Sequence, residues 1–133
     1  MNRSLVDLLR ASVERAPGAE AVVHAQRRVS YGDLWHQIAA LSAFLEGQGL
    51  RPGDRVALLL ENSPEYVAAY YGVLSAGGAV VALNTQTKAR DLANWLQHCG
   101  AIWLIASAQH AELAALLAQR GDYGVICVNR AGQ

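Results

Sequence analysis

The most constraining feature of this sequence is its long apolar stretch at residues 55–83, RVALLLENSPEYVAAYYGVLSAGGAVVAL. It opens with an uninterrupted apolar run, Val56–Leu60, whose length and composition are typical of a strand buried on both faces. A second such run, 79–83, follows Gly77 and Gly78, and such a glycine pair ends helices. The stretch therefore predicts a strand, a helix and a second, parallel strand joined by a right-handed crossover.

Ser63, Pro64 and Glu65 predict where the central helix begins. A serine side chain caps backbone N–H groups, proline fits the first helical position, and a glutamate complements the positive end of the helix dipole. From residue 66 to 76 the helix has no charged side chain, which predicts that it is covered on all sides. A membrane span is the alternative for the uncharged stretch 66–83, but its glycine pair and β-rich second half argue against one. We therefore expect a helix sandwiched between two layers of a soluble α/β protein.

The flanking segments extend this unit in both directions. Before it, the patterns predict a helix at 4–15 with Leu5, Leu8, Leu9 and Val13 on one face, a short hairpin of 21–24 and 28–30, and a helix capped at Ser30 and stopped at 47–49. After it, they predict a helix at 89–98 with Leu92, Trp95 and Leu96 inward, a strand at 101–105, a helix at 109–119 and a strand at 124–128. The predicted fold class is α/β: a partial doubly wound, flavodoxin-like parallel sheet with flanking helices and a short N-terminal β-hairpin.

Composition narrows the function classes. Hydrophobic residues make up 53% of the chain, and the formal net charge is +0, which is apolar for a free-standing domain. The eleven basic residues are scattered, so nucleic acid is not an expected partner. Cys99 and Cys127 lie in apolar segments, which predicts buried, reduced thiols in a cytoplasmic protein. The charged, amphipathic N-terminus lacks the apolar core of a secretory signal.

Ligands of open parallel sheets bind beyond the carboxyl ends of the strands, so the loops at 61–63, 84–88 and 106–109 are the expected places for a site. The first loop precedes a helix N-terminus that could hold an anion, but Glu61 and Glu65 would repel a phosphate, which favours plain helix capping. The second loop carries Lys88, and Arg90 follows. These two side chains could meet a phosphate, and the simpler interpretation is a solvated helix start.

No catalytic or metal-binding motif is visible. The histidines are far apart and lack the spacing of metal ligands: His24, His36, His98 and His110. The chain has no nucleophile elbow, no phosphate-binding P-loop and no dinucleotide fingerprint. Trp35, Trp95 and Trp103 lie in predicted elements and are expected in the core or an interface rather than under a ligand. From the residues alone, we expect no catalytic residue and no metal ligand.

Six short motifs follow one another along nearly the whole chain: VSYGDL at 29–34, GLRPGDRVA at 49–57, ENSPE at 61–65, YGVLSAGG at 71–78, LN at 83–84 and CGAIWLI at 99–105. In this order and at these spacings they resemble the opening of the AMP-forming acyl-CoA synthetases and related adenylation domains. The resemblance implies a ligase that uses ATP and Mg²⁺ to turn a carboxylic acid into an acyl-adenylate and pyrophosphate, and then passes the acyl group to a thiol such as coenzyme A.

The resemblance also implies that residues 1–133 form the N-terminal subdomain of such an enzyme, with 1–50 as helix, hairpin and helix and 51–133 as the parallel α/β unit. The family's phosphate loop, adenine motif, acyl pocket and C-terminal catalytic lysine have no counterpart here. This implies a scaffold that is inactive alone and whose partner is the remainder of the catalytic domain. Some members carry a basic residue for the coenzyme A phosphate just after the asparagine that matches Asn84. Thr85 and Gln86 occupy the matching positions, so Lys88 and Arg90 are the candidate substitutes.

Two other hypotheses remain open. One is a self-contained interaction module, in which the apolar faces of Tyr66, Tyr70, Val73 and Leu74 would be exposed and then buried in a homodimer. The other is a small flavodoxin-like nucleotide-binding protein, which has only the fold class in its favour. The acyl substrate cannot be identified from this stretch.

Overall fold

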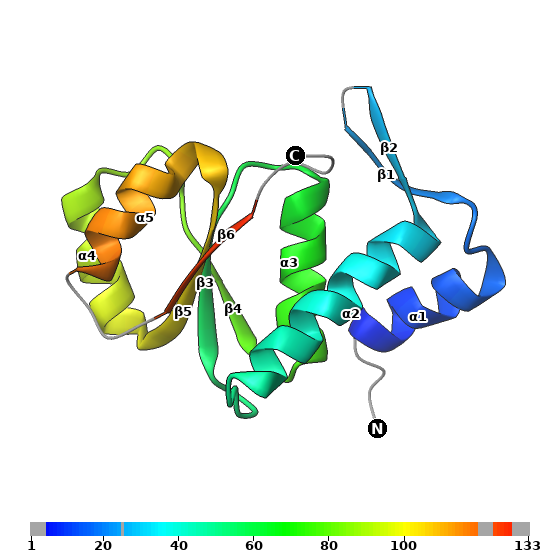
Figure 1. Cartoon of the computed structure of the whole chain (residues 1–133), viewed down its shortest axis with the longest axis horizontal. Coiled ribbons are helices and arrows are strands. Elements are labelled where there is room, and N and C mark those ends of the chain that lie inside the picture. The colour runs from blue at the N-terminus through cyan, green and yellow to red at the C-terminus, as the bar shows by residue number, and fades with distance from the viewer. Residues whose placement is uncertain (1–4, 25, 120–123, 129–133) are drawn as a thin grey trace.

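The computed structural model describes residues 5–24, 26–119 and 124–128 (Figure 1). Its elements in chain order are α1 (Leu5–Arg15), β1 (Glu20–His24), β2 (Arg27–Ser30), α2 (Tyr31–Gly47), β3 (Arg55–Leu59), α3 (Pro64–Ser75), β4 (Ala79–Ala82), α4 (Ala89–Cys99), β5 (Ala101–Ser107), a 3₁₀ turn η1 (Ala108–His110), α5 (Ala111–Ala118) and β6 (Gly124–Val128). The boundaries follow the sequence predictions closely, except that the helix expected at 109–119 is divided into η1 and α5.

Four strands form one parallel sheet in the order β4-β3-β5-β6, and β1 and β2 form a separate antiparallel hairpin. The chain leaves the inner strand β3 to add β4 on one side, and then crosses back to add β5 and β6 on the other. α3 covers one face of the sheet, together with α2, while α4 and α5 cover the opposite face (Figure 1). The predicted doubly wound, flavodoxin-like fold with a short hairpin is confirmed.

The core lies on both faces of β3, as its continuous apolar run predicts. Val56 and Leu58 point to the side of α3, whereas Ala57 and Leu59 point to the side of α4 and α5, and all four are 0% exposed. Burying a leucine or valine side chain contributes about 2 kcal/mol. β3 therefore fixes both helical layers to the sheet.

The apolar helix α3 is covered within this chain. α2 packs against it so closely that a Cβ atom added at Gly72 would lie 2.7 Å from Leu41 Cδ2. Val73 is fully buried, and Tyr66, Tyr70 and Leu74 are half-buried. The chain's own N-terminal helices thus cover much of α3, as its lack of charged side chains predicts, and the exposed apolar face that the interaction-module hypothesis requires is not found at these four residues.

Two expected burial patterns are also wrong. On α4, Leu92 and Leu96 are buried but Trp95 is 60% exposed, because the buried stripe of this helix is narrow and Trp95 lies beside it rather than on it. On α1, Val6 is the buried residue, whereas Leu5 and Leu8 are exposed. The exposed large apolar side chains in the described ranges are Leu5, Leu8, Val23, Phe44, Trp95, Ile102 and Leu116.

The cysteines differ from the prediction that both are buried. Cys99 is half-buried, and its Sγ lies 3.6 Å from the carbonyl oxygen of Leu96. Cys127 is exposed, because it lies near the end of β6, which is an edge strand with a single neighbour in the described sheet. The helix caps are as predicted: Ser30 Oγ accepts from the Asp33 N–H, and Gly100 ends α4 at φ +69°. None of the described helices is long and apolar enough to cross a membrane.

Candidate functional site

The strand order creates a switch point between β3 and β5. These strands are neighbours, yet the chain leaves β3 toward α3 on one face of the sheet and leaves β5 toward α5 on the other. In open α/β sheets, ligands bind in the crevice that such diverging connections leave at the carboxyl ends of the strands. Here a hollow of about 550 Å³ lies at this place, lined by His24, Gln26, Arg27, Leu60, Glu61, Asn62, Ser63, Glu65, Ser107, Ala108, Gln109 and Val128.

Ser63 shapes the loop that forms one wall of this hollow. Its hydroxyl accepts from the backbone N–H of Tyr66 at 3.2 Å, as expected of an N-cap, and donates to the carbonyl of Glu61 at 3.0 Å. Pro64 follows at the first helical position. The loop is therefore held by its own sequence, and the prediction of plain helix capping is confirmed.

Glu61 ties the two diverging connections together. Its carboxylate accepts from Ser107 Oγ, with distances of 3.0 Å to Oε1 and 3.2 Å to Oε2. His110 Nε2 also lies 3.2 Å from Oε2, at ion-pair distance. That nitrogen is buried and makes no well-aligned hydrogen bond. The β3–α3 loop is thus bonded to Ser107 at the start of η1 through this carboxylate, and His110 at the end of η1 lies against it.

Arg27 on the hairpin binds the second carboxylate of the hollow. Its guanidinium donates to both oxygens of Glu65, to Oε1 at 2.8 Å and also to Oε2. The hydrogen bonds to Glu65 raise the pKa of Arg27 above its ordinary value, against the opposing effect of burial. The expectation that Glu65 would act as a free negative charge at the helix start is therefore corrected, because the hairpin brings a cation to it.

The chemistry of the hollow follows from these contacts. Both carboxylates are engaged: Glu65 accepts a charge-assisted fork from Arg27, and Glu61 accepts from the Ser107 hydroxyl with the His110 imidazole close by. Within the ranges that the structure describes, no group of three or more His, Cys, Asp or Glu side chains could hold a metal ion. The hollow is lined by polar side chains that are hydrogen-bonded to one another, and these bonds join the hairpin, α3 and β5.

The loop after β4 reaches the same edge of the sheet but does not line this hollow. Asn84 orders it, because its Oδ1 accepts from the Gln86 N–H at 2.8 Å and its carbonyl accepts from the Thr87 N–H at 3.0 Å. Lys88 is the N-cap residue of α4, and its side chain makes no capping bond. Lys88 and Arg90 are both exposed, as a solvated helix start requires.

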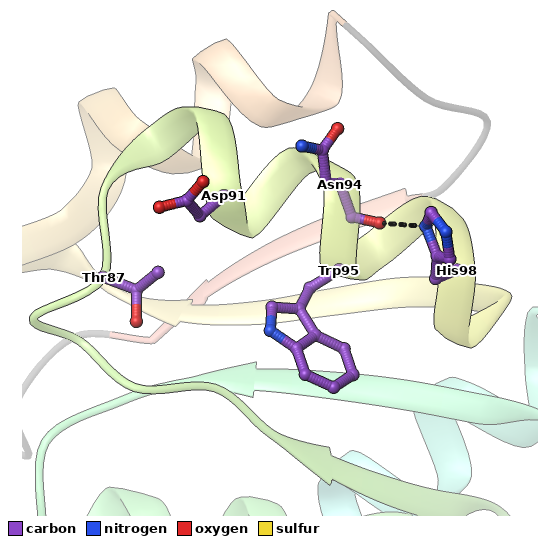
Figure 2. A pocket seen from close by; sticks show the side chains of 5 residues that line it. All are labelled: Thr87, Asp91, Asn94, Trp95 and His98. Atoms are coloured by element: carbon purple, nitrogen blue, oxygen red, sulfur yellow. Dashed lines mark hydrogen bonds between the residues drawn. The ribbon is translucent and has the colours of Figure 1, made fainter.

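A second, shallower hollow of about 500 Å³ lies on the outer surface of α4. Figure 2 shows the five side chains that line it: Thr87, Asp91, Asn94, Trp95 and His98. The imidazole of His98 is held by its Nδ1, which donates to the carbonyl oxygen of Asn94 at 2.9 Å. The indole of Trp95 borders this open surface rather than the core, so an aromatic ring is available to solvent.

Sequence reasoning expected a site at all three loops. Two of them, 61–63 and 106–109, line the first hollow, whereas the structure places the third, 84–88, apart from it. Sequence reasoning missed Arg27, Ser107 and His110 as partners of the two glutamates, and no local pattern marks these partners. It also missed the exposure of Trp95, which lies three positions after the buried Leu92 and so has the spacing of an apolar stripe.

Known proteins resemble this chain in sequence and in fold. A sequence model of the family described as AMP-binding enzyme matches residues 9–132. The long-chain-fatty-acid–CoA ligase of Bacillus subtilis (strain 168) is 41% identical over 83 residues, which make up 62% of this chain and 15% of that protein. The feruloyl-CoA synthase of Amycolatopsis sp is 38% identical over 103 residues, 77% of this chain and 21% of that protein.

Solved structures agree. A benzoate CoA ligase from Burkholderia xenovorans LB400 superposes with a TM-score of 0.88 over 96% of this chain and 26% of its own, at 22% identity, which is evidence for the fold alone. VinN in complex with 3-methylaspartate superposes with a TM-score of 0.83 at 30% identity, over 93% of this chain and 34% of its own. The chain spans only 15% to 23% of the length of the curated relatives. Since the family model matches nearly every residue, the chain belongs to the AMP-binding enzyme family.

Proposed function

We propose that this chain is the N-terminal portion of an adenylate-forming acid–thiol ligase. Such an enzyme joins a carboxylic acid to ATP to give an acyl-adenylate and pyrophosphate, and then transfers the acyl group to a thiol such as coenzyme A. The observation that carries the proposal is the family match over residues 9–132, supported by relatives that are named as CoA ligases and synthases.

The role of this chain in that enzyme is a scaffold, inactive by itself. The residues present do not fit ATP with Mg²⁺, because Glu61 and Glu65 are already bound within the chain and the described residues offer no metal-ligand cluster. The nucleotide and its metal therefore belong to the remainder of the catalytic domain, which is this chain's partner. In the same proposal residues 1–50 and 51–133 are the two parts of one N-terminal subdomain of a cytoplasmic enzyme.

Lys88 and Arg90 are proposed to contact the phosphate of coenzyme A. Both side chains are exposed at the start of α4, where the helix dipole also favours an anion and no side chain caps the backbone. Asp91 in the same turn opposes this attraction, so two cations are needed to hold a phosphate there. These residues would thus bind the acceptor thiol and take no part in adenylation.

A chimera tests the scaffold role. The matching segment of the Bacillus subtilis ligase is replaced by this chain, and thioester formation is measured. The chimera is expected to be active, while the 133-residue chain alone shows no ATP–pyrophosphate exchange. Exchange by the chain alone, or a folded chimera without any adenylation, would overturn the proposal.

The same chimera tests the phosphate contact. Lys88→Gln and Arg90→Gln are each expected to raise the KM for coenzyme A about two- to fivefold, the usual range for one exposed charge interaction. Pyrophosphate exchange should not change. Arg51→Gln is the matched control, because Arg51 is equally exposed but precedes β3, at the opposite edge of the sheet. Equal effects of all three substitutions would exclude a specific contact.

A further inference from the structure

The three tryptophans of the chain have different surroundings. The guanidinium of Arg10 lies over the ring of Trp35, 5.5 Å from its centroid. Trp103 packs edge to face with Phe44, with ring centroids 5.9 Å apart. Trp95 has neither an aromatic nor a cationic partner among the described residues, and it is 60% exposed. One aromatic ring is thus left unpaired on the surface.

Polar groups surround this ring. Asp91 lies one helical turn before Trp95 on the same face of α4, and Thr87 completes that end of the hollow (Figure 2). The carboxylate of Asp91 is exposed and takes part in no ion pair within the described ranges. At the other end, His98 is bonded to the Asn94 carbonyl. The open part of the hollow therefore offers a ring face and an exposed carboxylate that lie one helical turn apart on α4.

These two groups are complementary to a planar cation. The face of an indole ring carries negative potential, and Asp91 holds the one full negative charge among the five lining residues. A guanidinium can stack on an indole and at the same time donate a fork of N–H groups to a carboxylate, whereas an ammonium is a strongly hydrated point charge. Arg10 and Trp35 show a guanidinium placed over an indole ring inside the same molecule.

Lys88 and Arg90 are positively charged neighbours that would repel a cation entering the hollow. Both are exposed and lie on the same turn as Asp91, but neither lines the hollow. They weaken the attraction of this surface for any positive charge. Binding of a particular cation must therefore depend on contacts with the ring face and the carboxylate. This requirement favours arginine over lysine.

We propose that the Trp95 hollow is a docking site for an arginine side chain of a partner polypeptide. Trp95 provides the stacking surface, Asp91 binds the guanidinium N–H groups, and Thr87 borders the same end. The site lies on the outer face of α4, away from the hollow at the switch point. This inference stands on the geometry of α4 and is independent of the proposed ligase activity.

The test follows the indole N–H signal of Trp95 in ¹⁵N-labelled protein, assigned by its loss in Trp95→Phe. The probes are three short peptides that differ only in a central arginine, citrulline or lysine. The arginine peptide is expected to shift the Trp95 signal saturably, with at most weak shifts from the other two. Asp91→Asn should weaken binding about two- to fivefold. Leu116→Ala, an exposed site on α5, is the matched control and should not change it.

Three outcomes would overturn the proposal. Citrulline would be as effective as arginine if the site recognised only a planar group, and lysine would be as effective if it recognised only charge. A shift of the Trp95 signal with protein concentration alone would identify the occupant as a second copy of this chain. The Trp103 signal, which reports the packed contact with Phe44, shows in each variant that the protein is folded.

Discussion

The hollow at the switch point and the start of α4 differ in whether their charged side chains have partners within the chain. At the switch point each carboxylate has a partner from a distant segment, since Glu65 is bound by Arg27 and Glu61 by Ser107. At the start of α4, Lys88, Arg90 and Asp91 are exposed and form no ion pair in the part of the chain that the structure describes. Partnered charges hold segments together, whereas unpartnered ones remain available to ligands. The first region is therefore expected to govern stability and the second to govern recognition.

The largest stability effect should come from breaking the pair between the hairpin and α3. Arg27→Met and Glu65→Gln are each expected to lower the free energy of unfolding by about 1–3 kcal/mol, because each leaves a partly buried group without its partner. The double variant should cost less than the sum of the two. Urea unfolding measures all three. Arg28→Met is the control, since the Arg28–Glu20 pair on the same hairpin is exposed and should contribute less than about 1 kcal/mol.

The pH dependence of this pair follows from the direction of the pKa shift. The pKa of Arg27 is raised above its ordinary value by its hydrogen bonds to Glu65, so the stability that its charge contributes is fully present below the ordinary pKa of arginine and is lost only as the pH rises through the raised pKa. The difference between the native chain and Arg27→Met should therefore stay constant between about pH 7 and pH 10. A difference that fades within this range would contradict the assignment of the effect to the guanidinium.

A smaller effect is expected from Ser107→Ala. This substitution removes the hydroxyl that donates to Glu61, and the loss of one hydrogen bond to a charged group costs about 1–2 kcal/mol. Ser12→Ala is the matched control, because the described hydrogen bonds of the Ser12 hydroxyl are both long and stay within its own helix, to the Leu8 carbonyl and from Arg15 Nη2. It should change the unfolding free energy by less than about 0.5 kcal/mol. If both substitutions lowered the free energy of unfolding equally, the Ser107 hydroxyl would contribute no more to stability than the Ser12 hydroxyl, and this prediction would be wrong.

The smallest effect is expected at the start of α4. Lys88→Gln combined with Arg90→Gln should change the unfolding free energy by less than about 0.5 kcal/mol, because neither side chain forms an ion pair in the described structure. Urea unfolding of the double variant provides the measurement. A loss as large as that of Ser107→Ala would show that these cations have a structural role, and the comparison between the two regions would then fail.

Local patterns in the sequence predict the elements of this fold well. The apolar run of β3, the Ser63-Pro64 start of α3 and the glycine that ends α4 each act within a few residues, and the structure has them where they were expected. The family resemblance rests on the same kind of short motif. These features could be read directly because propensity, capping and periodicity are local properties of the chain.

The candidate sites were less predictable, because they depend on contacts that are distant in sequence. Arg27 and Glu65 are 38 positions apart, and Glu61 and Ser107 are 46 apart, so no period or spacing links them. The absence of charge in α3 predicts that this helix is covered, but the element that covers it is α2, and patterns within α3 do not specify that partner. Trp95 is a different case, since one position around a helix decides between the core and the surface.

The long separations at the switch point have a consequence for the order in which the chain folds during synthesis. β3, α3 and β4 form one local unit, and Arg27 can already bind Glu65 once α3 has left the ribosome. Glu61 must wait for Ser107, which is synthesised with β5. A nascent chain that ends soon after residue 83 would therefore have its hairpin fastened to α3, while Glu61 still faces water.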